Sequence, residues 1–327
     1  MKKLLTLSLF LSLAFMQGKI GGYAIFDFNG TTQQFDIDRT YFQYTNDISD
    51  NLFFKLRFDV GRSSDILDAD SNNENDAQFE ADSKLIVYLK NVYIDWKCPQ
   101  GGKLTMGLLG TNSYGVQEKN WGYRFISKSV LDSYGMTKTA DFGIGYSHSF
   151  GDFNMNIQAV NGEGFKADFD PENINDDKPT AYIRLMYGEE NLTKNEGFNV
   201  GMVYTTAYNS TDKDYSNNLS GIFSGYAGHN FRLGVEFNRQ KIDEIGENAH
   251  ALYFNYAFND KIALFTRYDV NNENTGNNSS TSKTLLGLVF NPTKGLYIAP
   301  NIIVENITDD IGEPRTEEYR LTCMFKY

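Results

Sequence analysis

Charged and large apolar side chains alternate along the segment from Leu52 to Arg62. Lys55, Arg57 and Asp59 stand two residues apart, and each is flanked by Phe, Leu or Val. Successive side chains of a β-strand point to opposite faces, so the three charges share one face and the apolar side chains share the other. A Lys and an Arg are costly in a dry core but cost little against water. The spacing therefore predicts a wet face able to attract or repel ions and an apolar face turned away from water.

The same alternation with a period of two recurs from end to end of the chain. In the last segment, from Glu317 to Tyr327, the side chains of Tyr319, Leu321 and Phe325 fall on one face, and that of Arg320 falls on the other. The alternating segments lie near residues 20–28, 34–45, 52–61, 84–97, 103–110, 139–149, 153–161, 180–188, 197–208, 218–227, 231–241, 249–258, 261–270, 283–290, 296–305 and 317–327. Their number, about sixteen, is even, as in bacterial barrels.

The links between these segments are alternately long and short. The long polar links are 63–83, 111–138, 163–179 and 271–282, and the short ones are 47–50, 99–102, 151–152, 259–260 and 291–295. Barrels of outer membranes have long outer loops and tight periplasmic turns, and a closed barrel is the only sheet that can cross a bilayer. The sequence therefore predicts an all-β fold, a transmembrane antiparallel β-barrel of about 16 strands with long extracellular loops and short periplasmic turns. A soluble β-sandwich is the alternative.

One residue breaks the strand pattern. Pro300 lies inside the segment 296–305 and lacks the amide hydrogen that a central strand needs. A barrel has no free edge to place it on, so we expect a bulge or a local break there.

Composition excludes two classes of protein. The 327 residues carry a formal net charge of -12, without a basic stripe, which argues against a nucleic-acid partner. No interior run reaches the roughly 20 apolar residues of a spanning helix, which excludes a helical membrane protein. Residues 1–18 begin with Lys2 and Lys3 before a short apolar stretch, which is typical of a secretory signal peptide. We therefore expect residues 19–327 to form a barrel in a bacterial outer membrane, with outer-membrane lipid around it.

Read in order, the segments resemble a family of Gram-negative outer-membrane porins, the phosphate-selective porins O and P and their relatives. The resemblance covers the chain to about residue 165, and the residues that carry it are Gly22-Tyr23, Arg39–Tyr41, Phe54–Gly61, Lys90–Asp95, Trp121–Arg124, Ala140–Gly143 and Val160–Gly164. It implies a sixteen-stranded channel, a homotrimer, whose third outer loop folds into the lumen. The family's phosphate selectivity is tied to a lysine cluster that has no match here, so that specificity is not carried over.

The link 111–138 matches the position of that inward-folded loop. It holds Trp121 and other aromatic residues that are unfavourable in water, together with Glu118, Lys119, Arg124 and Lys128. Long ordered loops are often functional. We predict that this link is a constriction loop, with its aromatics against the wall and its charges toward a passage. The alternative is a lid packed over the barrel mouth.

The wall supplies a second set of charges. The cationic residues on the inward registers are Arg39, Lys55, Arg57, Arg184, Arg232, Arg267, Arg320 and Lys326. The acidic ones are Asp59, Asp95, Asp141, Glu236, Asp269 and Glu305. Rings of charge set ion selectivity where a passage is narrow, and this set leans basic, so a weak anion preference is a hypothesis. The alternative is that these charges only keep the lumen hydrated.

Catalytic and metal-binding patterns are weak. None of the three histidines, His148, His229 and His250, stands with a Ser and a carboxylate in a recognisable order. The acidic link 63–83 starts like a calcium loop at Asp68 but lacks its glycine and its terminal Glu, so an acidic rim is the better interpretation. We predict no enzyme, catalytic residue, cofactor or metal site.

These patterns lead to one function and one alternative. The main hypothesis is a porin, for passive diffusion of small hydrophilic solutes and ions across an outer membrane. The alternative is a structural or surface-binding outer-membrane barrel with a blocked lumen.

Overall fold

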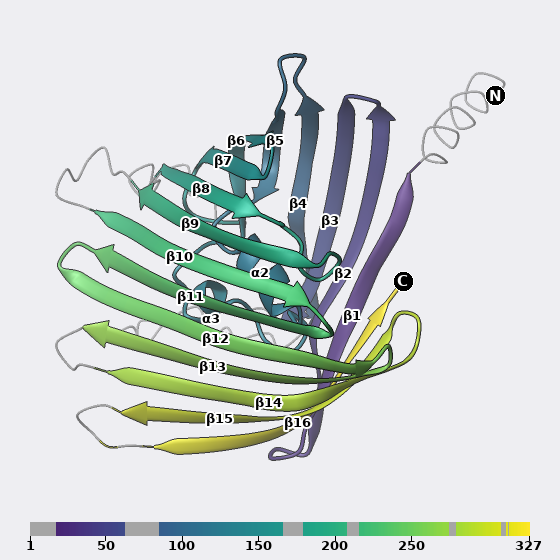
Figure 1. Cartoon of the computed structure of the whole chain (residues 1–327), viewed down its shortest axis with the longest axis vertical. Helices are drawn as coiled ribbons and strands as arrows, with labels where there is room; N and C mark the ends of the chain where they lie inside the picture. Colours follow the sequence, from purple (N-terminus) through teal and green to yellow (C-terminus); the bar gives the residue numbers. More distant parts are fainter. Residues whose placement is uncertain are drawn as a thin grey trace, which may run out of the picture.

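Sixteen antiparallel strands form a closed ring, in which each strand pairs with its neighbours in the sequence and β1 (Lys19–Asn29) pairs with β16 (Arg315–Lys326). The computed structural model describes residues 18–62, 85–165, 179–207, 216–274, 279–308, 312 and 314–327. The prediction of a sixteen-stranded barrel is confirmed (Figure 1). The signal peptide predicted for residues 1–18 lies, except for Gly18, outside the described residues, and so does the acidic link 63–83.

The strands follow the predicted segments closely. Those between the first and last are β2 (Gln34–Ser49), β3 (Leu52–Arg62), β4 (Leu85–Lys97), β5 (Lys103–Gly110), β6 (Ala140–Phe150), β7 (Phe153–Val160), β8 (Thr180–Gly188), β9 (Gly197–Ala207), β10 (Asn217–Gly228), β11 (Phe231–Ile242), β12 (Ile245–Asn259), β13 (Ile262–Asn274), β14 (Ser280–Thr293) and β15 (Leu296–Thr308). None of the helices in the described residues is long and apolar enough to cross a membrane.

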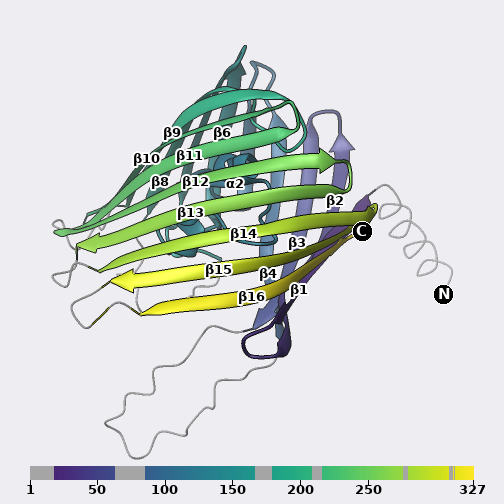
Figure 2. The same ribbon diagram turned by 60° about the horizontal axis from the view of Figure 1, so that its bottom comes forward.

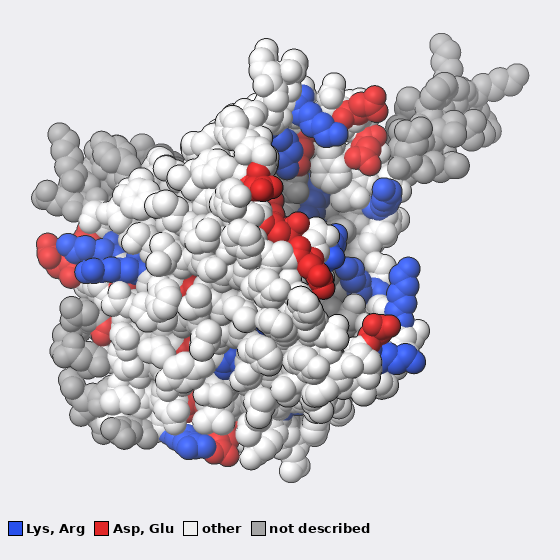
Figure 3. All heavy atoms as spheres, in the orientation of Figure 1, with Lys and Arg blue, Asp and Glu red and all other residues white. Residues whose placement is uncertain are grey.

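The barrel is apolar outside and polar inside. Large side chains such as Phe42, Phe142 and Leu252 are exposed, whereas the charged side chains of Asp59 and Arg267 are buried. The outer face over β10–β14 is largely free of charge, and the charged residues gather toward the strand ends (Figure 3). This arrangement is the reverse of a soluble protein and suits a lipid surround.

Links of two kinds define the two ends of the barrel. The loop end carries the links that follow odd-numbered strands, including 111–139 and 161–179, and the turn end carries those that follow even-numbered strands, such as 151–152 and 260–261. The segment predicted at 249–258 begins earlier in the structure, at Ile245, so only residues 243–244 separate β11 from β12. Polar residues such as Glu247 and Asn248 belong to β12 there, and polar strand residues are ordinary in a barrel with a wet interior.

Two strands deviate from regular pairing. In β4, Lys90 is an extra residue, because Arg57 pairs with Asn91 and the adjacent Phe58 pairs with Leu89. Near Pro300, the pairing of β15 with β14 is interrupted between the pairs Gly287–Asn301 and Phe290–Ile298. The register is the same before and after this gap. The pairing of β15 with β16 continues through Pro300. The expected local break is therefore confined to one side of the strand.

The link 111–139, called the inner segment below, lies inside the barrel. It contains two short helices, α2 (Gly115–Trp121) and α3 (Val130–Ser133), and both views place α2 within the ring of strands (Figure 1, Figure 2). Its apolar side chains join those of β10 and β12–β15 in one buried cluster. The inner segment thus covers that side of the wall.

Candidate functional site

The inner segment owes its path to its own sequence. Helix α2 ends where Gly122 adopts a left-handed conformation with φ of 80° and donates its N–H to the carbonyl of Glu118 at 2.7 Å. A Cβ at Gly122 would lie 1.9 Å from a guanidinium nitrogen of Arg232, so only glycine fits this turn. Helix α3 begins at Ser129, whose hydroxyl accepts the N–H of Asp132. The end of α2 at Gly122 and the start of α3 at Ser129 set the path of the segment inside the barrel.

Side chains of the wall hold the backbone of the inner segment. The carbonyl of Trp121 accepts hydrogen bonds from Asn255 Nδ2 at 2.8 Å and from an amino group of Arg232 at 3.1 Å. The carbonyl of Lys128 accepts one from Arg267 at 2.6 Å. These carbonyls lie near helix ends, where intrahelical partners are lacking. The wall residues therefore fix the place of the segment.

The aromatic side chains of the segment also pack on the wall. The ring of Trp121 lies 5.7 Å from that of Tyr253 and 5.8 Å from that of Phe265, centroid to centroid, and the guanidinium of Arg267 lies 5.3 Å from the Trp121 ring. Both Trp121 and Arg267 are 1 % exposed. The sequence predicts Trp121 on the inward-folded loop, with the loop aromatics against the wall, and Arg267 on an inward register of the wall. Both side chains lie where the inner segment covers the wall.

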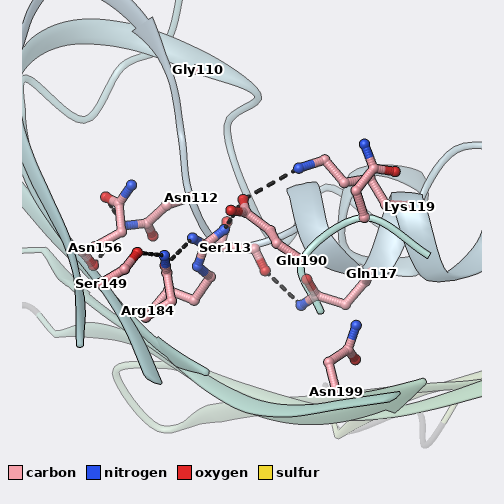
Figure 4. Close-up of polar contacts among 12 residues, drawn as sticks. Gly110, Asn112, Ser113, Gln117, Lys119, Ser149, Asn156, Arg184, Glu190 and Asn199 are labelled. Carbon is pink, nitrogen blue, oxygen red and sulfur yellow. Dashed lines mark hydrogen bonds and ion pairs between the residues drawn. The ribbon is translucent and has the colours of Figure 1, made fainter. Parts of the chain in front are cut away.

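A second polar network ties the start of the inner segment to the wall near the turn end. Glu190, in the link between β8 and β9, lies between Lys119 and Arg184, at 3.2 Å from each (Figure 4). Burial opposes ionisation of Glu190, but these two cations hold its pKa below the ordinary value. Arg184, which the sequence places on an inward register, is 5 % exposed and also bonds Asn154, so it lies buried between the wall and the segment.

Between the inner segment and strands β1–β5 lies a cavity of about 190 Å³, called the basic cavity below. Its charged lining residues are Arg39, Lys55, Arg57, Lys90 and Arg124, against Glu118 and Asp132. Four tyrosines line it as well, namely Tyr23, Tyr41, Tyr93 and Tyr114. Five cations against two acids give this cavity a positive lining.

Only some of these cations are neutralised by an ion pair. Arg39 lies 3.5 Å from Asp59, and Arg124 lies 2.7 Å from Glu118 and 3.4 Å from Asp132.

The other three cations rest on neutral partners. Arg57 bonds the amide oxygen of Gln43 at 2.6 Å, Lys90 bonds the hydroxyl of Thr139, and Lys55 lies over the ring of Tyr93. None of the three forms an ion pair within the described residues. Their charge remains available to a mobile anion.

Glu118 faces the basic cavity from α2, outside the spanning strands. Burial raises its pKa, although the neighbouring Arg124 opposes that rise. Asp132 adds to the rise through its negative charge. Glu118 therefore takes up a proton at higher pH than a free carboxyl group does.

Toward the loop end, Arg124 also lines a second cavity with mixed charge. Wall residues pair there: Lys283 with Glu305 at 2.8 Å and Arg320 with Glu318 at 2.5 Å. Its charged lining residues are Asp27, Asp38, Arg124, Lys128, Lys283, Glu305, Glu318 and Arg320. Arg124 lines both cavities.

The structure divides the predicted site residues into three groups. Those at the basic cavity or the ion pairs beside it are Arg39, Lys55, Arg57, Asp59, Glu118 and Arg124. Those at the loop-end cavity are Lys128 and Arg320. Those that hold or lie behind the inner segment are Lys119, Trp121, Arg184, Arg232 and Arg267.

Lys90 is the main residue that the sequence reasoning missed. Outward apolar residues occupy odd positions as far as Leu89 and even positions from Val92 onward, so two inward residues must lie between them. A bulge produces this change of phase. The shift in the apolar pattern was the signal that could have placed Lys90 inside.

The histidines are far apart in the fold. His148 lies in β6, with its Nδ1 at 3.0 Å from the hydroxyl of Tyr146. His229 lies in the turn between β10 and β11, and His250, in β12, packs on Phe237 of β11. In the part of the chain that is described, no group of His, Cys, Asp and Glu is arranged to hold a metal ion.

The ring of strands, apolar outside and charged inside, defines the protein as a sixteen-stranded transmembrane β-barrel. Neither a protein-family model nor a curated protein matches the chain.

Solved structures of outer-membrane barrels do match it. The outer membrane channel DcaP of Acinetobacter baumannii is similar with a TM-score of 0.65 and 8% identity, over 95% of this chain and 97% of that chain. The anion-selective porin from Comamonas acidovorans gives 0.59 and 12% identity, over 95% and 99%. The trimer form of OmpT from Vibrio cholerae gives 0.62 and 13%, over 95% and 99%. At these identities the likeness shows a porin-like barrel fold. It does not show the phosphate-selective family.

Proposed function

We propose that the protein is an outer-membrane porin for passive diffusion of small hydrophilic solutes and ions, with a weak preference for anions. The observation that carries this proposal is the pair of charged cavities, both lined by Arg124, between the inner segment and the wall. Charged cavities beside an inward-folded segment suit a selective constriction in a water-filled barrel. The likeness to an outer membrane channel and to an anion-selective porin supports the same function.

The anion preference rests on the unequal pairing of charges. Lys55, Arg57 and Lys90 lie in the basic cavity without an ion pair to the described residues, whereas both acids that line it lie beside Arg124. A mobile anion therefore meets uncompensated positive charge at this level. A mobile cation meets carboxylates that already have a partner.

Conductance and reversal potential in a planar bilayer test the proposal. The purified barrel should give steady single-channel steps, and under a KCl gradient its reversal potential should have the sign of chloride preference. Lys55→Glu should shift that potential toward potassium, while Lys241→Glu, at an exposed residue of β11, should leave it unchanged. Clear potassium preference of the unmodified protein would contradict the anion preference and leave the porin function standing.

A barrel with a blocked lumen is the second candidate. The observation in its favour is the dense packing of the inner segment, whose Trp121, Val130 and Leu131 are buried against the wall. Absence of conductance from a protein with the heat-dependent electrophoretic mobility of a folded barrel would favour this candidate.

The location and assembly belong to the same proposal. Residues 1–18 would act as the signal peptide, and outer-membrane lipid would cover the apolar outer face. A homotrimer is supported by the likeness to the trimer form of OmpT. Membership of the phosphate-selective porin family is supported by the inward-folded segment, without a transfer of phosphate selectivity. Membrane fractionation and the mass of the detergent-solubilised protein test these points.

A further inference from the structure

Aromatic side chains line the basic cavity together with its cations. The rings of Tyr23 and Tyr41 lie 4.8 Å apart, from centroid to centroid. Arg57 lies over Tyr41 at 4.8 Å, and Lys55 lies over Tyr93 at 5.8 Å. A site for a simple inorganic ion needs charge alone, whereas a row of rings adds affinity for flat apolar surface.

The register of the wall explains why rings and cations are neighbours. Tyr23 pairs with Tyr41 across β1 and β2, and Lys55 pairs with Tyr93 across β3 and β4. Lys55 and Arg57 are two residues apart on one strand, so both point inward. The sheet therefore presents two adjacent cations with a tyrosine on either side.

Several polar groups of this wall have no partner in the described residues. The ammonium of Lys55 has no hydrogen bond there, and neither have the hydroxyls of Tyr23 and Tyr93, although all three residues line the basic cavity. Groups of this kind are free to bind a solute. Two hydroxyl donors and two cations in one place suit a carboxylate.

The cavity also has the size of a small ring. Its volume is about 190 Å³. A cavity of about 150 Å³ accommodates benzene in other proteins, so the volume here is in the range that a benzene ring with one carboxylate needs.

We propose that the basic cavity binds small carboxylates carried on an aromatic ring, with benzoate as the simplest member. The carboxylate lies at Lys55 and Arg57, and the ring packs among Tyr23, Tyr41 and Tyr93. This proposal rests on the porin function and specifies the class of solute that the same passage selects. The channel would then admit aromatic acids ahead of other anions of equal charge.

Block of the chloride current in a planar bilayer tests the proposal. Four probes are added in turn: benzoate, cyclohexanecarboxylate, acetate and inorganic phosphate. Benzoate should reduce the current at a concentration roughly three- to tenfold lower than cyclohexanecarboxylate, which has the same charge and a saturated ring. Acetate and phosphate should need higher concentrations still.

Two variants separate ring recognition from charge. Tyr93→Leu should weaken the block by benzoate more than the block by acetate, because benzoate loses both a ring contact and a hydroxyl donor, whereas Lys55→Gln should weaken both blocks to a similar extent. The matched control is Tyr268→Leu, since Tyr268 lies on the outer face of β13 with 48 % of its surface exposed. A heat shift in electrophoretic mobility establishes that each variant is folded.

The outcomes keep the two proposals apart. Equal block by benzoate, cyclohexanecarboxylate and acetate would overturn the aromatic site, and so would stronger block by phosphate. In both cases the measured conductance leaves the porin function intact. A folded barrel without conductance would overturn the porin function and this inference with it.

Discussion

The guanidinium of Arg267 donates a hydrogen bond to the carbonyl of Lys128 at 2.6 Å while its Nε lies 2.7 Å from Asp269. One wall residue thus joins the inner segment to a buried carboxylate. The contact with Asp269 is local, because Arg267 and Asp269 are two residues apart on one face of β13. The contact with Lys128 joins residues that are far apart in the sequence. It links the barrel wall to the segment that lies inside the barrel.

Replacing this anchor should loosen the inner segment and destabilise the barrel. Arg267→Met leaves Asp269 as an uncompensated buried charge, a loss of about 3–5 kcal/mol in comparable pairs. We expect a lower temperature for the heat shift in electrophoretic mobility and a noisier single-channel current. Arg239→Met, on the exposed face of β11, is the control.

A double variant separates the two effects. Arg267→Met combined with Asp269→Leu leaves no uncompensated carboxylate, so the temperature of the heat shift should return toward that of the unmodified protein. The noise should persist, because the bond to Lys128 is still absent. Quiet current in both variants would show that Arg267 does not hold the segment.

Gly122 should tolerate no side chain. Gly122 has a φ of 80°, which alanine rarely adopts. A Cβ there would also lie 1.9 Å from the Arg232 guanidinium, so Gly122→Ala must displace the group that binds the Trp121 carbonyl. Strain of this kind costs about 1–3 kcal/mol. We expect a lower heat-shift temperature and an altered conductance. Gly115→Ala is the matched control, since nothing lies within 4 Å of a Cβ there. Equal behaviour of the two variants would contradict this account.

The strand ring was predictable because its signal is local. Alternation in a barrel with a wet interior is read directly from neighbouring residues, so the inward position of Lys55 and Arg57 follows from the sequence alone. The start of β12 was missed, since Glu247 is an ordinary inward residue of that strand and resembles a loop residue in sequence.

The covering of the wall was not predictable from the strands. Arg184 and Arg267 lie on inward registers like Arg57, and only the path of the inner segment decides which of them meets the open space. That path depends on contacts distant in sequence, such as Asn255 with the carbonyl of Trp121. Strand periodicity carries no information on such contacts.

Lys90 should contribute to anion preference although its position depends on a bulge. Lys90→Gln removes one unpaired charge from the basic cavity and keeps a polar side chain. Unit charges a few ångströms apart in water interact by about 1 kcal/mol or less, so the chloride-to-potassium permeability ratio should fall roughly two- to fivefold. Reversal potentials under a KCl gradient measure the ratio. Lys241→Gln makes the same change of charge on the outer face, and an equal effect there would contradict a specific role of Lys90.

Acidic pH should increase the preference for anions through Glu118. Its pKa is raised by burial, so it binds a proton while ordinary glutamates are still ionised. Protonation removes the negative charge beside Arg124 and leaves that guanidinium less compensated, so the basic cavity becomes more positive as the pH falls. The reversal potential should therefore move toward chloride in a step that begins above the usual range for Glu.

The test of this step is a variant with the charge removed at all pH values. Glu118→Gln should show the stronger chloride preference already at neutral pH and should lack the first step of the titration. The other carboxylates of the lumen are the same in both proteins, so any later rise in more acidic solution should be common to the two. If the variant and the unmodified barrel gave the same pH profile throughout, Glu118 would not control the charge at this level, and the preference would be set by the wall cations alone.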